Sequence, residues 1–449
     1  MDKSISKLIG FLVLASVYAG CHSIKEDRDE EYVIYSPGVR SALRIWEQKE
    51  FVLSTFNGVP EDTTKYLSAL TKIKEANFNY IETAWLKSEN TQAILRICDQ
   101  LKGLKVIAQD LDLLGGFARW TYIPYERDSL LNFLQKYGKH SSLGGVYVFD
   151  EPYHEHFSIV KKNTDELELL RPDLLGFTVI LQSYSPWYNW ENSAVMSFSD
   201  YVEKYIEETT PPILCSDYYP FQEDLTDSLF WESDFWKDMA FLRKKVIEHG
   251  LIHWFYYQAQ AVNGTNINLR EEHLKLQFWI AIMYGVKGVS SFTACPAVID
   301  EQGGYGSFFQ VTKKLNSQIK ALGNTLLSLH SAAIYHGNSN INDPYANALN
   351  ESVFLEELPH RISVGEFVDV ENNHYFLILN NSLQENCNEP LLLKTNFRIY
   401  LCDPDNGGWQ RVLIEKSDRI SLSLNPAEAM LVRIEDTAKP ARLIKYLIN

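Results

Sequence analysis

Eight short apolar strings, separated by longer amphipathic segments, constrain the fold of this chain more than any other feature. Aromatic and β-branched residues are frequent in these strings, which is typical of buried strands. The strings cover 51–56, 78–85, 104–111, 144–151, 174–181, 212–219, 251–258 and 286–293. Most of the segments between them have apolar residues at helical spacing. Eight such alternations over about 280 residues predict a (β/α)8 TIM barrel.

The runner-up topology is an open, doubly wound sheet, which also alternates strands with helices. The sequence has no glycine-rich phosphate loop of the kind that such a nucleotide-binding sheet uses. After about residue 335 the pattern changes to strands alone, separated by turn signals such as "ENN" (371–373) and "DNGG" (405–408). We therefore expect an α/β chain with a barrel over 46–335, followed by a small all-β antiparallel sandwich over 336–449.

The first twenty residues have the pattern of a secretory signal peptide. Two lysines precede an apolar run that is too short for a permanent membrane span. The run ends in two small residues before Cys21, and this arrangement resembles the lipobox of bacterial lipoproteins. The charged segment 22–31 is similar to the export signals of Bacteroidetes surface lipoproteins. The resemblance implies a signal peptide (1–20), a lipid on Cys21, a tether (21–45) and an outer-membrane location; an ordinary cleaved signal is the alternative.

Composition narrows the classes of partner. A net charge of −16 argues against nucleic acid, whose phosphates such a field would repel. The chain has 10 Trp, 25 Tyr and 23 Phe, and exposed rings are one way to hold the faces of sugars, although a large aromatic core would also explain them. Metal-ligand spacings are missing from the sequence, so we expect no metal and no cofactor.

The fourth apolar string ends in two adjacent acids, Asp150 and Glu151, followed by Pro152. Barrels place their chemistry at this end of the strands. A strand cap, or an acidic start to the following helix, is the alternative explanation of the pair. Cleavage of a glycosidic bond needs one protonated carboxyl and a second carboxylate nearby. Like-charge repulsion from Asp150 favours the protonated form of Glu151.

Four stretches resemble one enzyme family: "DEP" (150–152), "SDYYPF" (216–221), "REEHLKLQFWIAIMYGVKGVSSFT" (270–293) and "VGEFVDVENNHYFLILNNS" (364–382). They are similar to bacterial glycoside hydrolases of the large retaining superfamily with (β/α)8 barrels, especially β-galactosidase-like lipoproteins. In that family the fourth strand ends in Asn-Glu-Pro, so the resemblance implies that Glu151 is the general acid/base, with Asp150 in place of Asn.

In the family that the chain resembles, the nucleophile ends the seventh strand, where this chain offers only Gln258 and Gln260. Asp217, at the end of the sixth strand, is the best substitute, although it could instead bind sugar hydroxyls. Weaker candidates are Glu82, Asp110 and Asp112.

Two other functions remain open. Substrate-assisted hexosaminidases also end the fourth strand on an Asp-Glu pair, and there the 2-acetamido group of the sugar attacks while the Asp orients it. A surface lipoprotein that binds glycans without cleaving them would keep the rings and lose the nucleophile. The expected sugar-binding residues lie near strand ends, where strand parity decides which side chains point inward: Trp85, Trp120, Trp187, Tyr218, Tyr219, Trp254, Tyr257 and Gln258.

Overall fold

A computed structural model describes residues 38–116, 127–186, 188, 196–262, 265, 267–411 and 417–436. Cys21, Trp120 and Trp187 lie outside these ranges, as do the expected signal peptide and most of the tether.

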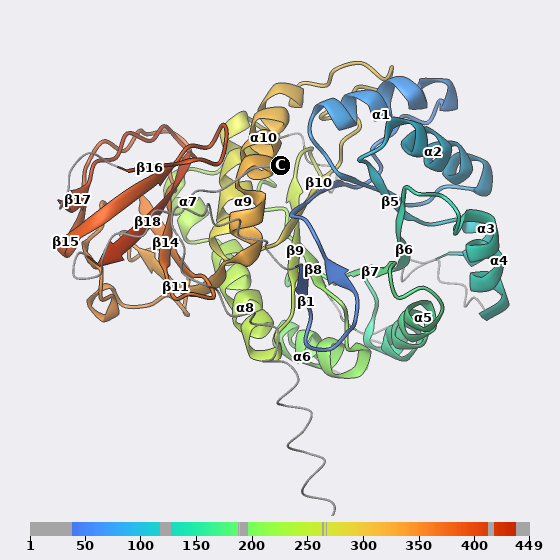
Figure 1. Cartoon of the computed structure of the whole chain (residues 1–449), viewed down its shortest axis with the longest axis horizontal. Coiled ribbons are helices and arrows are strands. Elements are labelled where there is room, and N and C mark those ends of the chain that lie inside the picture. The colour runs from blue at the N-terminus through green and yellow to red at the C-terminus, as the bar shows by residue number, and fades with distance from the viewer. Residues whose placement is uncertain are drawn as a thin grey trace, which may run out of the picture. The chain divides into compact units, whose positions relative to one another are not determined.

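Eight parallel strands form the predicted barrel (Figure 1). They are β3 (Val52–Thr55), β4 (Tyr80–Thr83), β5 (Lys105–Ala108), β6 (Leu143–Asp150), β7 (Leu175–Val179), β8 (Leu214–Asp217), β9 (His253–Gln258) and β10 (Gly288–Phe292). Neighbouring strands pair in chain order, and β10 also pairs with β3. Between β3 and β4, the backbone N–H of Asn79 donates to Leu53 O at 3.0 Å and that of Asn57 donates to Glu82 O at 3.2 Å. These bonds close the ring. Seven of these strands fall within the strings expected from the sequence, and β6 begins one residue before its string, at Leu143.

Helices follow the strands and lie outside the ring (Figure 1). They are α1 (Tyr66–Glu75), α2 (Ser88–Leu101), α3 (Leu111–Leu114), α4 (Arg127–Tyr137), α5 (Phe157–Leu170), α6 (Phe198–Thr209), α7 (Asp227–Trp231), α8 (Asp234–His249), α9 (Glu271–Met283) and α10 (Phe309–Ser328). Local signals set their ends: Ser197 caps α6 through a hydrogen bond from Asp200 N, and Gly250 ends α8 at φ 62°. Of the helices in the described ranges, none combines the length and the apolar character that crossing a bilayer requires.

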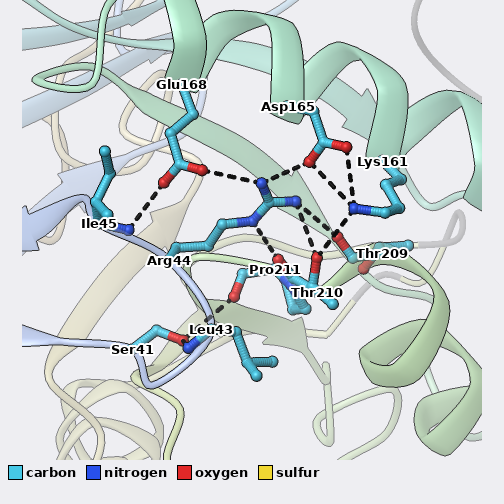
Figure 2. A network of polar contacts seen from close by, with 10 residues as sticks. All are labelled: Ser41, Leu43, Arg44, Ile45, Lys161, Asp165, Glu168, Thr209, Thr210 and Pro211. Atoms are coloured by element: carbon cyan, nitrogen blue, oxygen red, sulfur yellow. Dashed lines mark hydrogen bonds and ion pairs between the residues drawn. The ribbon is translucent and has the colours of Figure 1, made fainter. Parts of the chain in front are cut away.

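An amino-terminal segment crosses the barrel at the amino ends of its strands. Its short strands β1 (Val39–Arg40) and β2 (Glu47–Gln48) pair with each other. Between them, the nearly buried Arg44 donates to Asp165 (2.6 Å) and Glu168 (3.1 Å) of α5 and to the carbonyl of Thr209 (3.0 Å) at the end of α6 (Figure 2). A buried guanidinium with several charged and polar acceptors holds a segment in one geometry. Residues 38–45, expected as the end of a tether, are therefore packed against the barrel.

A second, antiparallel sheet follows the barrel. Its strands are β11 (His330–His336), β12 (Leu355–Glu357), β13 (Ile362–Val368), β14 (His374–Asn380), β15 (Leu391–Cys402), β16 (Trp409–Arg411), β17 (Ser417–Ile420) and β18 (Ala429–Asp436). The long strand β15 pairs with β12 and β17 near Leu391 and with β18 from Phe397 onward. Side chains from both parts of the sheet bury a common apolar cluster. This arrangement fits the expected sandwich, and its first strand begins at His330.

Helix α9 is buried on almost every side. It packs against β9 of the barrel and against β13 and β14 of the antiparallel sheet. Glycine allows the closest approach, because a Cβ at Gly365 of β13 would lie 2.6 Å from the carbonyl oxygen of Met283. One buried cluster includes Leu276 of α9 and Leu377 of β14.

Candidate active site

A cavity of about 690 Å³ opens at the carboxyl ends of the barrel strands. Three acids line it, namely Asp150, Glu151 and Asp217. Seven aromatic side chains also line it: Phe56, Trp85, Tyr147, Tyr184, Tyr219, Tyr256 and Phe292. The strand ends thus bring together the three acids that the sequence predicted as catalytic, in a cavity large enough for a sugar.

Glu151 follows β6 directly and has a left-handed backbone, with φ 50°. Its N–H donates to Val179 O of the neighbouring strand at 2.9 Å, which fixes the turn. Trp85, two residues beyond β4, also has a positive φ, of 64°. Positive φ is unfavourable for both residue types, and such strain concentrates at functional sites. The helix that follows, α5, begins only at Phe157, so Glu151 does not belong to its first turn.

The amide of Gln182 joins two of the acids. Its Nε2 donates to Oδ2 of Asp217 at 2.6 Å and also to Oε1 of Glu151. Burial raises the pKa of Asp217 to about 7, while hydrogen bonds from Gln182 and Tyr219 oppose that rise and the charge of Asp150 adds to it. Asp217 can therefore exchange a proton near neutral pH.

Asp150 lies beside this pair and accepts a hydrogen bond from the hydroxyl of Tyr147 at 3.0 Å. Both residues come from β6, three positions apart, and both line the cavity. A register shift in the pairing of β6 with β7 lies between Tyr147 and Phe149. Irregular pairing of this kind redirects side chains at strand ends.

Glu82 of β4 is fully buried behind the cavity wall. Its Oε1 accepts hydrogen bonds from the hydroxyls of Ser54 (2.7 Å) and Ser290 (2.9 Å), and its Oε2 accepts one from Tyr256. Burial is the main cause that raises the pKa of Glu82 to about 8. Tyr256 lines the cavity, so its hydrogen bond connects Glu82 to the cavity wall.

The other weak candidates for a second carboxylate have structural partners. Asp110 caps α3 and accepts hydrogen bonds from Ser88 and Tyr137, both at 2.7 Å. Asp112 accepts a hydrogen bond from the backbone of Ser88. Neither lines the cavity.

The predicted sugar-binding residues divide between the cavity and the interior. Trp85 and Tyr219 line the cavity. Trp254 points into the barrel near the amino end of β9 and donates to Gln48 at 2.8 Å. Tyr257 is buried against Phe278 of α9, on the outside of the strands.

Tyr218 and Gln258 also lie outside the cavity lining. Tyr218 packs against Phe235 of α8, with ring centroids 5.5 Å apart. Gln258 is buried and bonds the backbone of Phe221 through both ends of its amide, each at 2.9 Å. Gln258 therefore holds the loop after β8. It ends the seventh barrel strand, which is where the glycoside hydrolases that the sequence resembles have their nucleophile.

Within the described ranges, no three His, Cys, Asp or Glu side chains gather as a metal site would require. Sequence reasoning missed several rings that line the cavity, namely Phe56, Tyr147, Tyr184 and Phe292. It also missed Gln182, which lies three residues beyond β7 in an irregular segment, so no periodic pattern marks it.

Comparisons with known proteins give structural similarity alone. The chain matches no family model and no curated protein. It is similar to the GH27 β-L-arabinopyranosidase from Geobacillus stearothermophilus, with 11% identity, a TM-score of 0.48 and coverage of 88% of this chain and 98% of that one.

Two further structures show the same level of similarity. For the GH51 arabinofuranosidase from Xanthomonas axonopodis pv. citri, identity is 10%, the TM-score is 0.46, and coverage is 90% of this chain and 98% of that one. For a β-glucuronidase from an uncultured Clostridium species, identity is 10% and the TM-score is 0.44. The match covers 62% of this chain and 53% of that enzyme, so this chain spans about half of its length. These similar structures are glycoside hydrolases with TIM-barrel folds.

Proposed function

We propose that this protein is a glycoside hydrolase that cleaves a glycosidic bond in an extracellular glycan. One observation carries the proposal: two carboxyls, Glu151 and Asp217, share the amide of Gln182 in a cavity lined by aromatic rings. A pair of carboxyls is the minimum that this chemistry requires, and rings are suited to the apolar faces of sugars.

The spacing of the pair supports a retaining mechanism. Two hydrogen bonds to one nitrogen place the accepting oxygens of Glu151 and Asp217 within about 6 Å of each other. Retaining enzymes hold their carboxyls about 5 to 5.5 Å apart, whereas inverting enzymes need about 6.5 to 9.5 Å to admit a water molecule. In this mechanism one carboxyl protonates the leaving oxygen and the other attacks the sugar.

The two roles can be assigned in two ways. The resemblance of the "DEP" stretch makes Glu151 the general acid/base and Asp217 the nucleophile. The raised pKa of Asp217, about 7, supports the reverse assignment, because a general acid must hold its proton near neutral pH. We retain Glu151 as the general acid/base and test it against the reverse.

The test compares Glu151→Gln and Asp217→Asn on alkyl and activated aryl glycosides. Loss of the general acid should lower turnover of alkyl glycosides by about 10²-fold or more. Aryl glycosides should suffer less, because their leaving groups barely need the proton. Loss of the nucleophile should be severe on both. If Asp217→Asn is the variant that spares the aryl substrate, the roles are reversed.

A substrate-assisted hexosaminidase is the second candidate, because Asp150 lines the cavity beside Glu151 and could orient an acetamido group. That mechanism predicts cleavage only of 2-acetamido sugars. Asp150→Asn should then lose most of its turnover, and Asp217→Asn should remain active. If the protein binds glycans but cleaves none, it is a glycan-binding protein, and the catalytic proposal fails.

A further inference from the structure

We propose that Gln182 is a positioning residue that sets both the spacing and the ionisation of the Glu151–Asp217 pair. The inference rests on the proposed function, and it adds a residue that no sequence pattern marks. Gln182 is nearly buried, with 8% of its surface exposed. Its amide lines the cavity beside the two acids.

The geometry suits the nitrogen of an amide. The nitrogen of a glutamine amide carries two hydrogens, and here each acid accepts one of them. Hydrogen bonds from such a donor favour the ionised form of a carboxyl, because they are strongest to a charged acceptor. Gln182 thus counteracts the burial that raises the pKa of Asp217.

The backbone around Gln182 is held by two stacked tyrosines. The Tyr188 hydroxyl donates to Gln182 O at 3.0 Å. The Tyr201 hydroxyl of α6 accepts from Leu181 N at 3.3 Å and donates to Pro152 O at 2.7 Å. The two rings stack with centroids 4.9 Å apart.

One hydroxyl, that of Tyr201, therefore ties the residue before Gln182 to the residue after Glu151. The backbone segments that carry the Gln182 amide and the Glu151 carboxyl are thus bonded to the same side chain. Precise positioning of a site requires such contacts. The stacked tyrosines do not line the cavity, so they can be changed without touching a bound sugar.

Other ionisable groups lie near the Glu151–Asp217 pair, and none of them is substituted in the variants below. They are Glu82 from β4, Tyr147 and Asp150 from β6, Tyr184 after β7, Cys215 and Tyr219 from β8 and the loop after it, and Tyr256 from β9.

The test is Gln182→Met, which keeps the length of the side chain and removes the donor. The titration of Asp217 would be followed by ¹³C NMR of labelled aspartate carboxyls, with Asp217→Asn to assign the signal. We expect the Asp217 midpoint to rise by about one pH unit, the usual worth of a hydrogen bond to a charged group. The acidic limb of kcat should move by the same amount, and kcat should fall by about 10²-fold.

Gln92→Met is the matched control, because Gln92 also contacts another side chain, at 2.8 Å from His140, but lies on α2 away from the cavity. It should leave both the titration and kcat unchanged. If Gln182→Met does not fold, Tyr201→Phe is a second variant for the same test. It should lower kcat and change KM less. It should also shift the Asp217 midpoint in the same direction.

The two proposals can fail separately. If the wild type cleaves no glycoside but the Asp217 midpoint is higher in Gln182→Met than in the wild type, the role of Gln182 is supported and the hydrolase is rejected. Cleavage by the wild type, with an unshifted Asp217 midpoint in Gln182→Met, would reject the role of Gln182. A uniform loss of activity without a change in the pH profile would show that Gln182 is only structural, and would also overturn the proposal.

Discussion

Glu82 shows how the barrel interior maintains a buried acid. Two serine hydroxyls and one tyrosine hydroxyl bond its carboxyl, each from a different strand. Because burial disfavours the charged form, the pKa of Glu82 is raised to about 8 and the group is largely protonated at neutral pH. The folded state therefore binds a proton that the unfolded chain releases.

This difference predicts how stability depends on pH. The pKa of the carboxyl is 4.5 in its ordinary, exposed state and about 8 in the folded protein, so the folded state binds more protons between these values. The free energy of unfolding should fall as pH rises through this window, by at most about 1.4 kcal/mol per pH unit. Glu82→Gln should remove this component, and urea unfolding at about pH 5 and about pH 8 measures it.

The control is Glu301→Gln, which changes an exposed glutamate in a turn. Its stability should follow that of the wild type at both pH values. If the stability of Glu82→Gln falls as steeply with pH as that of the wild type, the burial of Glu82 does not cause the pH dependence.

Residues at strand ends could be predicted, and residues in loops could not. Asp150, Glu151 and Asp217 each follow a recognisable apolar string, and a barrel gathers such positions at one end. The direction of each side chain was harder to predict, because neighbouring positions along a strand point to opposite sides of the sheet. Tyr256 lines the cavity, whereas Tyr257 packs under α9.

At the scale of elements, α9 is the point at which the barrel strands and the antiparallel sheet share buried surface. Its sequence is apolar all round rather than amphipathic, which indicates a helix covered on more than one side. The strand alternation could be read from periodicity, but the division of β15 between two sets of partners could not, since pairing depends on contacts remote in sequence.

Gly365→Ala tests the close approach between β13 and α9. The added Cβ would lie 2.6 Å from the Met283 carbonyl oxygen, so either the strand or the helix must move. Overpacking of this kind costs about 1 to 3 kcal/mol, and we expect a loss of that size in urea unfolding. Gly323→Ala in α10 is the control: its Cβ would lie 3.3 Å from Phe51 Cβ and alanine favours the helix, so stability should change little. Equal losses of stability in Gly365→Ala and Gly323→Ala would contradict a special role for the contact between Gly365 and Met283.

At the scale of the whole molecule, the proposed location rests on the sequence before residue 38. We propose that Cys21 carries a lipid that anchors the protein in the bacterial envelope, as its resemblance to a lipobox implies. Cys21→Ala should then abolish labelling with a radioactive fatty acid and release the protein into the soluble periplasmic fraction. A variant that still fractionates with membranes would contradict the anchor, and Cys98→Ala, which alters a buried thiol of α2, serves as the control.

The Arg44 contacts have a consequence for how substrate reaches the protein. They fasten the amino-terminal segment at the amino ends of the strands (Figure 2). The cavity opens at the carboxyl ends. A surface, bead or fused protein attached ahead of residue 38 is therefore joined to the side of the barrel away from the cavity mouth. Long polymer chains can approach an immobilised molecule from the open side without passing the point of attachment.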